Sequence, residues 1–282
     1  MPKYAVVTTF HAKGYDQYAQ KFIKTFLEMW PKEVTLYAYA ENTTILENAD
    51  NLVKRDLHLS SSELVAFKEK WKNVPKANGD VSKDPVRSKR KDSGKGFKWD
   101  AVRFSHKVYS IFHCADNTDA DILIWMDADM ICHSPITLST LEKLIPENSD
   151  LCYLGRDGKY PECGLYSLNL QRKVIRFFLK EFQRVYDDAD NGIFLMEEWH
   201  DSFVFEEIKK KFPKMNQFNW SANLGDLRPN NRNTIGEGHP LINCEWGAYL
   251  DHLKGESRKK RGKSLDTDIK VQRHETYWNS NV

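Results

Sequence analysis

Short apolar runs alternate with stretches of helical spacing at the start of the chain. Residues 4–10 and 34–40 have the length and composition of buried strands. Between them, apolar side chains recur every three or four residues from Tyr18 to Trp30, the spacing of one helix face, and Pro31 closes the segment. This order predicts a β-α-β unit and the start of a parallel sheet.

The turn after the first run carries neither a Gly-x-Gly-x-x-Gly nor a Walker pattern. This disfavours a dinucleotide-binding or P-loop fold. Thr8, Thr9 and Phe10 still fall at the carboxyl end of the strand, where α/β sheets bind ligands, so they could contact a base or a ribose. The alternative is that they are ordinary strand-end residues.

The central feature is an apolar run, residues 122–126, that ends in two carboxylates. A continuous apolar run of this length is typical of a strand buried on both faces. Asp127 and Asp129 are separated only by Ala128, and in an extended chain such residues point to the same side. Two adjacent anions repel unless a cation lies between them, and Mg²⁺ or Mn²⁺ takes oxygen ligands while leaving room for phosphates. The pattern predicts a metal and diphosphate site.

Asp-x-Asp pairs are not rare in this chain, and most such pairs are solvated turns. The pattern occurs four times, at Asp119/Asp121, Asp127/Asp129, Asp188/Asp190 and Asp266/Asp268. Only the second pair directly follows a buried apolar run, which is where ligands bind in open α/β sheets. That position singles it out.

A helix is predicted over residues 99–112, immediately before the central strand. Ala101, Ser105, Val108 and Phe112 mark its buried face, and Asp100, Arg103 and Lys107 lie at three- and four-residue spacing on another. Arg103 and Lys107 could therefore meet an anionic donor. The alternative is a surface ion pair between Asp100 and Arg103.

The remaining elements continue the α/β pattern. We expect helices over 138–145 and 175–185, strands near 150–154 and 162–169, a helix opening at 197–205, and a strand or short helix over 241–250. Trp199, His200 and Asp201 cluster where a helix N-terminus would face a pocket, although a capping carboxylate has the same pattern.

Composition favours one large α/β domain. The 282 residues are 40% hydrophobic and 12% aromatic, enough for a substantial core. The five cysteines include no C-x-x-C pair, which argues against a disulfide framework or a structural zinc site. The first residues run directly into a predicted strand and no segment approaches ~20 apolar residues. We expect a soluble cytoplasmic protein without a membrane span.

Positive charge gathers in two segments although the net charge is only +2. Residues 68–98 hold eleven Lys or Arg against four acids, with interrupting Pro and Gly, and predict a long, mobile, basic loop. The tail contains eight basic residues against three acids over 254–273. Such runs are usually solvated surface, but they could also attract nucleic acid or close over a phosphate.

Taken in order, these segments resemble GT-A fold glycosyltransferases, particularly the retaining family that includes glycogenin and galactinol synthase. The β-α-β start, the basic helix and Asp127-Ala-Asp129 come in the expected sequence. Residues 162–169 are similar to the family's Asn-Ser-Gly-Val segment, which lines the sugar and acceptor pocket. Residues 252–258 resemble its closing His-x-x-Gly-x-x-Lys motif, with Arg258 in place of the lysine.

The resemblance implies an α/β fold of the GT-A (Rossmann-like) type, with a mixed, mostly parallel sheet flanked by helices. It fits one domain over 1–282 with a basic tail at about 254–282, while the basic insert at about 68–98 has no counterpart in the family. The implied activity is transfer of a hexose from a UDP-sugar to an acceptor glycan or other hydroxyl compound, with Mn²⁺ or Mg²⁺, and with retention of configuration.

The resemblance also implies roles for individual residues. His252 would complete the metal shell of the two aspartates, while Lys254, Gly255 and Arg258 would hold the diphosphate. Ala128 and Gly164 would line the donor site. Asp201 and Glu162 are the candidate catalytic carboxylates, which would steady an oxocarbenium-like sugar.

Two other functions stay open at this point. A nucleotidyltransferase could use the same aspartate pair, although the chain lacks a Gly-rich triphosphate loop. A non-catalytic nucleic-acid-binding protein could use the basic loop and tail. A hybrid is an enzyme that glycosylates a hydroxylated base in DNA and grips the backbone with its basic segments.

Overall fold

The protein is described by a computed structural model that covers residues 1–156, 158–222 and 239–280, so the last two residues of the predicted tail lie outside it. The described strands form a seven-stranded sheet in the order β3-β2-β1-β4-β7-β6-β8, and β5 pairs with β9 in a separate small sheet. The strands are β1 (Tyr4–His11), β2 (Thr35–Glu41), β3 (Leu52–Asp56), β4 (Ile122–Met126), β5 (Met130–Cys132), β6 (Leu151–Arg156), β7 (Lys159–Asn169), β8 (Gln217–Asn219) and β9 (Leu250–His252).

One strand of the large sheet runs against the others. β1 pairs in parallel with β2 and β4, β2 with β3, and β6 with β8. β7 is antiparallel to both of its neighbours, β4 and β6. The first half of β7 therefore lies at the edge of the sheet where β4 ends, which brings residues near 164 beside residue 127. The predicted α/β fold with a mixed, mostly parallel sheet is confirmed.

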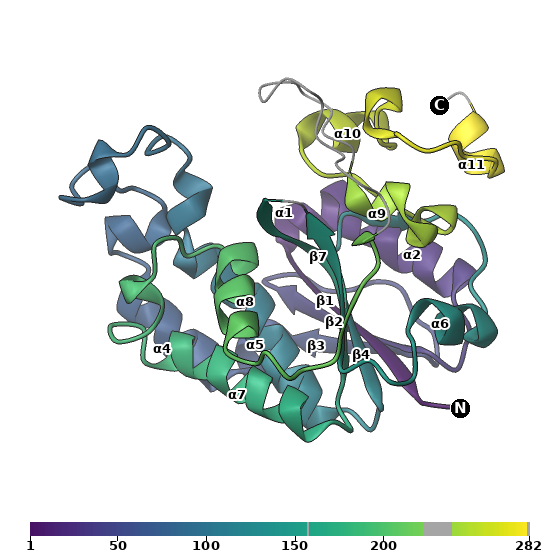
Figure 1. Cartoon of the computed structure of the whole chain (residues 1–282), viewed down its shortest axis with the longest axis horizontal. Helices are drawn as coiled ribbons and strands as arrows, with labels where there is room; N and C mark the ends of the chain where they lie inside the picture. The colour runs from purple at the N-terminus through teal and green to yellow at the C-terminus, as the bar shows by residue number, and fades with distance from the viewer. Residues whose placement is uncertain (157, 223–238, 281–282) are drawn as a thin grey trace.

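Helices cover both faces of the sheet. Along β1, Ala5 and Val7 point to one core and Tyr4 and Val6 to the other, as the two-residue period of a strand requires. The first core packs under α4 (Ser62–Trp71), α5 (Ala101–Asn117), α7 (Lys173–Asp187) and α8 (Asp201–Lys210), and the second under α2 (Gln20–Met29), α6 (Leu138–Leu144) and α9 (Pro240–Asn243). Figure 1 shows these two groups of helices on opposite sides of the strands.

In the described residues the helices are α1 (Ala12–Gly14), α2 (Gln20–Met29), α3 (Leu57–Ser60), α4 (Ser62–Trp71), α5 (Ala101–Asn117), α6 (Leu138–Leu144), α7 (Lys173–Asp187), α8 (Asp201–Lys210), α9 (Pro240–Asn243), α10 (Glu256–Arg261) and α11 (Thr276–Asn279). The five helices predicted from the sequence lie close to their expected positions, as α2, α5, α6, α7 and α8, while α1, α3, α4, α10 and α11 were not predicted. The π-helical turn η1 (Tyr15–Ala19) leads into α2. None of the described helices is long and apolar enough to cross a membrane.

Two expectations near α5 differ from the structure. Asp100 does not pair with Arg103 through its side chain; its carboxylate caps the helix by accepting the backbone N–H of Arg103 at 3.0 Å. Lys107 was predicted to share a charged face with both, but it is buried. The reason is that α5 packs against the sheet on one side and against α4 and α7 on others, so its buried surface is wider than one stripe.

The basic segment at 68–98 is more ordered than the predicted loop. Its first residues complete α4, and it continues through the 3₁₀ turns η2 (Pro75–Asn78), η3 (Arg87–Lys89) and η4 (Gly96–Trp99). Lys98 binds Glu198 at 2.6 Å, and the guanidinium of Arg87 lies 4.5 Å from the centre of the Trp199 ring. These contacts hold the segment against residues far along the chain, which the charge count alone does not reveal.

The C-terminal part also contains short 3₁₀ turns. These are η5 (Ile193–Leu195), η7 (Glu245–Ala248) and η8 (Asp266–Asp268). The region predicted as a strand or short helix over 241–250 contains both: α9 is followed by η7 and then β9. β9 pairs antiparallel with β5, so Met130 lies opposite His252. This pairing brings the C-terminal region to the end of the central strand.

Candidate functional site

The two central aspartates lie in a tight turn between β4 and β5. All five residues of β4 are buried, and the turn is closed by the N–H of Met130, which donates to the carbonyl of Asp127 at 3.2 Å. The N–H of Asp127 donates to the carbonyl of Gly164 on β7 at 2.9 Å, and the carbonyl of Asp129 accepts the N–H of Leu253 at 2.9 Å. Backbone hydrogen bonds from two other segments therefore fix both aspartates.

His252 completes a group of three ligand-type side chains. Its Nε2 lies 3.1 Å from Oδ1 of Asp129 and 3.7 Å from Oδ2 of Asp127. One ligand atom from each of the three lies within 4.8 Å of the others, a compact arrangement of the kind that can surround one ion. The structure thus brings together the three residues that the sequence picked out as metal ligands.

Lys107 reaches the same place from α5. Its Nζ donates to Oδ1 of Asp127 at 3.1 Å, to Oδ2 of Asp201 at 2.7 Å and to the carbonyl of Cys163. Burial alone would lower the pKa of Lys107, but the charges of Asp127 and Asp201 outweigh it and raise that pKa well above its usual value. The indole N–H of Trp125 also donates to Asp127, at 2.8 Å. Asp127 is therefore held on one side by a permanent cation.

Lys259 supplies a second cation, on the side of Asp129. Its Nζ lies 2.6 Å from Oδ2 of Asp129 and 5.0 Å from the centre of the Tyr18 ring. Burial would raise the pKa of Asp129, but His252 and Lys259 overcome this and hold the pKa well below its usual range. Conversely, Asp129 raises the pKa of His252 despite the burial of the ring.

Behind His252 lies a second polar group around Glu162. Oε2 of this buried carboxylate accepts a hydrogen bond from Nζ of Lys254 at 2.6 Å and lies 3.7 Å from Nε2 of His239. Burial opposes ionisation of Glu162, yet the nearby cation holds its pKa well below the usual range. Within the part of the chain that the structure describes, neither Nδ1 of His252 nor Nε2 of His239 has a hydrogen-bond partner.

Gly164 is required by the position of the His252 ring. A Cβ on this residue would lie 2.6 Å from Cε1 and 3.0 Å from Nδ1 of His252. Because a strand carries side chains on alternate faces, any larger residue here would point into the imidazole. The glycine that the resemblance assigned to the donor pocket therefore also makes space for the histidine.

Asp201 is the first residue of α8, and it is connected to Asp127 by Lys107, which pairs with both carboxylates. Its Oδ1 accepts the N–H of Ser202 at 2.8 Å, while its Oδ2 accepts from Lys107. Burial would raise the pKa of Asp201, but Lys107 outweighs it and lowers that pKa. The cap of α8 itself is His200, whose Nδ1 accepts the N–H of Phe203 at 3.4 Å.

The predicted residues at the end of β1 make contacts within the fold. Thr8 is fully buried, Thr9 donates to the carbonyl of Tyr39 at 2.9 Å, and the Phe10 ring stacks on Tyr15. These contacts fit the alternative of ordinary strand-end residues.

Of the basic residues, Arg103 is exposed and Arg258 pairs through both guanidinium ends with Asp268. Ala128 is buried in the turn, and Gly255 has a φ of 85° just before α10. The positive φ explains why a glycine stands at 255.

Two residues at the site were missed by the sequence reasoning. Lys259, not Arg258, reaches the aspartate pair, and His239 lies beside His252 with the ring centres 4.8 Å apart. Both come from regions with no local signal: Lys259 is one of four basic residues in a row, and His239 stands alone. Only the tertiary fold distinguishes them from their neighbours.

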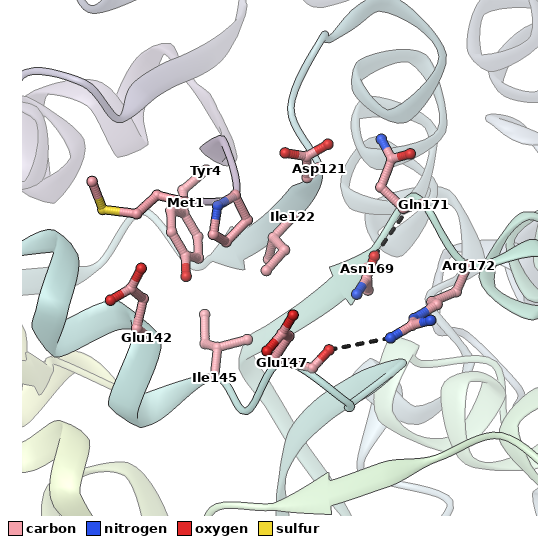
Figure 2. A pocket seen from close by; sticks show the side chains of 11 residues that line it. Met1, Tyr4, Asp121, Ile122, Glu142, Ile145, Glu147, Asn169, Gln171 and Arg172 are labelled. Carbon is pink, nitrogen blue, oxygen red and sulfur yellow. Dashed lines mark hydrogen bonds between the residues drawn. The ribbon is translucent and has the colours of Figure 1, made fainter.

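A separate pocket of about 730 Å³ lies at the opposite edge of the sheet, where β1 and β4 begin (Figure 2). Asp121, Glu142 and Glu147 face it together with Arg172, which donates to the carbonyl of Glu147 at 3.3 Å. None of the predicted site residues lines this pocket. The aspartate site and this pocket are therefore distinct.

Comparisons with known proteins add limited information. No protein-family model matches the chain, and no curated protein matches its sequence significantly. Among solved structures it is similar to the glycosyltransferase GlyE of Streptococcus pneumoniae TIGR4, with 10% identity and a TM-score of 0.44 over 80% of this chain and 47% of that one. It is also similar to the bifunctional glycosyltransferase WbbM, with 10% identity and a TM-score of 0.45 over 78% of this chain and 39% of that one.

Mouse xyloside xylosyltransferase 1 is similar over 77% of this chain and 84% of its own, with 13% identity and a TM-score of 0.42. The chain spans less than half the length of the first two proteins. At these identities and TM-scores the likenesses assign no activity to this chain. Its function has to be argued from the residues of the site.

Proposed function

We propose that the protein is a metal-dependent glycosyltransferase that moves a sugar from a nucleotide-diphosphate sugar to an acceptor hydroxyl. The observation that carries the proposal is that Asp127, Asp129 and His252 lie together at the end of a buried strand. Lys107 pairs with the first aspartate and Lys259 with the second. In line with the resemblance noted above, we propose a UDP-hexose donor, an acceptor glycan or other hydroxyl compound, and retention of configuration, as in glycogenin-like enzymes.

The chemistry of the three side chains fits a hard divalent ion. Two carboxylates and one imidazole suit Mn²⁺ or Mg²⁺, which prefer six ligands and so would leave positions for diphosphate oxygens. The separations of 3.1 and 3.7 Å between Nε2 of His252 and the carboxylate oxygens bracket those of ligands that share one ion. Lys259 competes for Asp129, so it must leave Oδ2 when an ion binds there.

Displacement of Lys259 would serve the reaction rather than hinder it. When bound, the metal acts as a Lewis acid toward the leaving diphosphate. The ammonium of Lys259 would then be free to bind phosphate oxygens, and Lys254, whose side chain is 53% exposed, is a second lysine that could do so. Both would stabilise the negative charge that builds on the departing nucleotide.

The two candidate carboxylates are suited to different tasks. Both are held ionised by lysines, so neither is a proton donor at neutral pH. Glu162 is only 3% exposed and is covered by Lys254 and His239, which makes it a positioning residue for those two side chains. Asp201 is more accessible, at 14%, and is the better candidate to steady positive charge on the sugar.

The proposal is tested by donor hydrolysis. The purified protein is incubated with Mn²⁺ or Mg²⁺ and a panel of nucleotide sugars, and release of the nucleoside diphosphate is followed. We expect slow, metal-dependent hydrolysis of UDP-hexoses that Asp127→Asn or Asp129→Asn abolishes.

A matched control is the exposed pair Asp188 and Asp190, which has the same Asp-x-Asp pattern and should tolerate the same change to Asn. Unchanged turnover in both Asp127→Asn and Asp129→Asn would refute the metal site. Release of pyrophosphate from a nucleoside triphosphate would indicate a nucleotidyltransferase instead.

A second candidate concerns the acceptor. Four exposed lysines of the basic segment, Lys83, Lys89, Lys91 and Lys95, form no ion pair among the described residues. They favour a polyanionic acceptor such as DNA that carries a hydroxymethylated base.

Because the segment packs against residues 196–199, its deletion would damage the fold, and the test is the replacement of these four lysines by Gln. We expect normal donor hydrolysis but weaker, less salt-dependent transfer to hydroxymethylated DNA. If the intact protein transfers no sugar to such DNA, this acceptor is excluded.

A further inference from the structure

A second group of metal-ligating side chains lies away from the aspartate pair. Glu41 ends β2, His58 lies in α3 and His106 in α5, and one ligand atom from each lies within 4.8 Å of the others. β1 lies between β2 and β4, and the register places Glu41 level with His11, three residues beyond the end of β4, so Glu41 is roughly 14 Å from that end. The group shares no residue with the site described above.

The distances match those around a tetrahedral ion. Oε1 of Glu41 lies 3.2 Å from Nε2 of His106 and 3.4 Å from Nε2 of His58. Two ligands of tetrahedral Zn²⁺, with bonds of about 2.0–2.2 Å, lie roughly 3.3–3.5 Å apart. Nε2 of His106 is buried and, among the described residues, no partner meets it with hydrogen-bond geometry, although the carboxylate of Glu41 is 3.2 Å away.

Both histidines direct Nε2 towards the carboxylate of Glu41. Nδ1 of His106 lies 3.0 Å from the carbonyl of Arg103, which can only accept, so this nitrogen carries a hydrogen and, in the neutral ring, Nε2 is the nitrogen with the lone pair. Metal-bound histidines commonly make this backbone contact through their other nitrogen. Nε2 of His58 accepts from Nζ of Lys68 at 3.0 Å, so it presents a lone pair as well.

Lys68 marks the place of the cation. Its Nζ lies 2.5 Å from Oε1 of Glu41 and 3.0 Å from Nε2 of His58. An ammonium group thus lies among acceptors that would repel one another without it. The four side chains are 15–30% exposed, so solvent reaches the group and the long Lys68 side chain can leave it.

We propose that Glu41, His58 and His106 form a binding site for a transition-metal ion of the Zn²⁺ class, and that Lys68 occupies this site when the metal is absent. Two imidazoles and one carboxylate favour Zn²⁺ over Mg²⁺ or Ca²⁺. Three protein ligands leave a fourth position for water or a small ligand. A bound ion would link β2, α3 and α5, since each contributes one ligand.

The test isolates this site by using the Asp127→Asn/Asp129→Asn/His252→Gln variant, which removes ligands from both of the other groups that could hold a metal. Titration with Co²⁺ is followed by its visible absorption, which is intense in tetrahedral sites, and titration with Zn²⁺ by calorimetry and by the shift in Tm. We expect one ion per chain, and binding about tenfold tighter after Lys68→Met because the competing charge is gone.

Glu41→Gln or His106→Gln should abolish this binding, while the same change at the exposed His274 should leave it intact. The Lys68→Met variant gains affinity, so the result does not depend on a variant that fails to fold. Zn²⁺ binding that is absent from Lys68→Met, or that survives both Glu41→Gln and His106→Gln, overturns the proposal. Either result leaves the metal dependence of donor hydrolysis untouched.

Discussion

Replacement of Lys107 by Met removes a cation that holds Asp127 and Asp201, two carboxylates from different parts of the chain. The methionine keeps the length and apolar character of the stem, which packs over Trp125 with Nζ 4.6 Å from the ring centre. The lost groups are the hydrogen bonds to Asp127, Asp201 and the carbonyl of Cys163. The variant therefore isolates the charge from the packing.

The magnitude follows from burial. Lys107 is 8% exposed, and the side chain of Asp201 is 14% exposed, so solvent cannot replace the lost partner fully. Removal of one member of a buried pair costs about 3–5 kcal/mol, because it leaves an uncompensated charge. Against a total stability of ~5–15 kcal/mol this is a large fraction, and the Tm should fall by roughly 6–20 °C.

The assay is urea unfolding followed by circular dichroism, with Lys70→Met as the control. Lys70 pairs with Asp190 at 2.8 Å, but both side chains are 60% exposed, so its loss should cost less than about 1 kcal/mol. Lys107→Met/Asp201→Asn should recover part of the loss, since it also removes a buried anion. A loss below about 1 kcal/mol in Lys107→Met would refute the reasoning from buried charge.

Three further changes test other parts of the structure. Gly164→Ala places a Cβ 2.6 Å from Cε1 of His252, so Mn²⁺ affinity measured by calorimetry should fall about 10- to 100-fold. Lys259→Met removes a cation that competes for Asp129, so Mn²⁺ should bind about tenfold tighter while UDP binds more weakly. Burial lowers the pKa of His133 to about 4. Between pH 7 and pH 4, His133→Phe should therefore lose roughly 3 kcal/mol less stability than the wild type does.

The sign of the His133 effect follows from linkage. A histidine whose pKa is lower in the folded chain binds its proton more readily when unfolded, so its contribution is present above about pH 6.5 and is lost as the pH falls towards 4. Equal acid sensitivity of His133→Phe and the wild type would contradict it.

Controls for the other two changes lie nearby. Gly94→Ala meets no atom within 4 Å, and Lys260 is the exposed next residue on α10. An equal fall of the Mn²⁺ affinity in Gly94→Ala and Gly164→Ala would contradict the contact with His252 as the cause. An equal rise in Lys259→Met and Lys260→Met would contradict the competition of Lys259 for Asp129.

The central part of the site could be predicted because its signal is local. A buried strand that ends in Asp127 and Asp129 is visible as an apolar run followed by two acids, and the structure places both carboxylates beside His252. The α/β architecture followed from the same alternation of apolar runs and helical spacing. Both depend only on residues close together in the sequence.

The missed features depend on contacts between distant residues. Lys107 was assigned to a charged face because spacing shows where a side chain points but not what covers it; its partners lie 20 and 94 residues away. The basic segment was read as a loop because its anions, Glu197 and Glu198, follow about 100 residues later. Charge counted in a window cannot include such partners.

The strand pairing of β5 with β9 has a consequence for when the proposed metal site forms during synthesis. The pairings of β1 to β4 and β7 can form once residue 169 has emerged from the ribosome, whereas His252 and Lys259 follow more than 80 residues later. At about 5–20 residues per second, the nascent chain holds its aspartate turn for several seconds without these partners. The group of Asp127, Asp129 and His252 is therefore completed late, and a ribosome that stalls in this interval carries a sheet that is largely assembled but lacks the histidine of the proposed metal site.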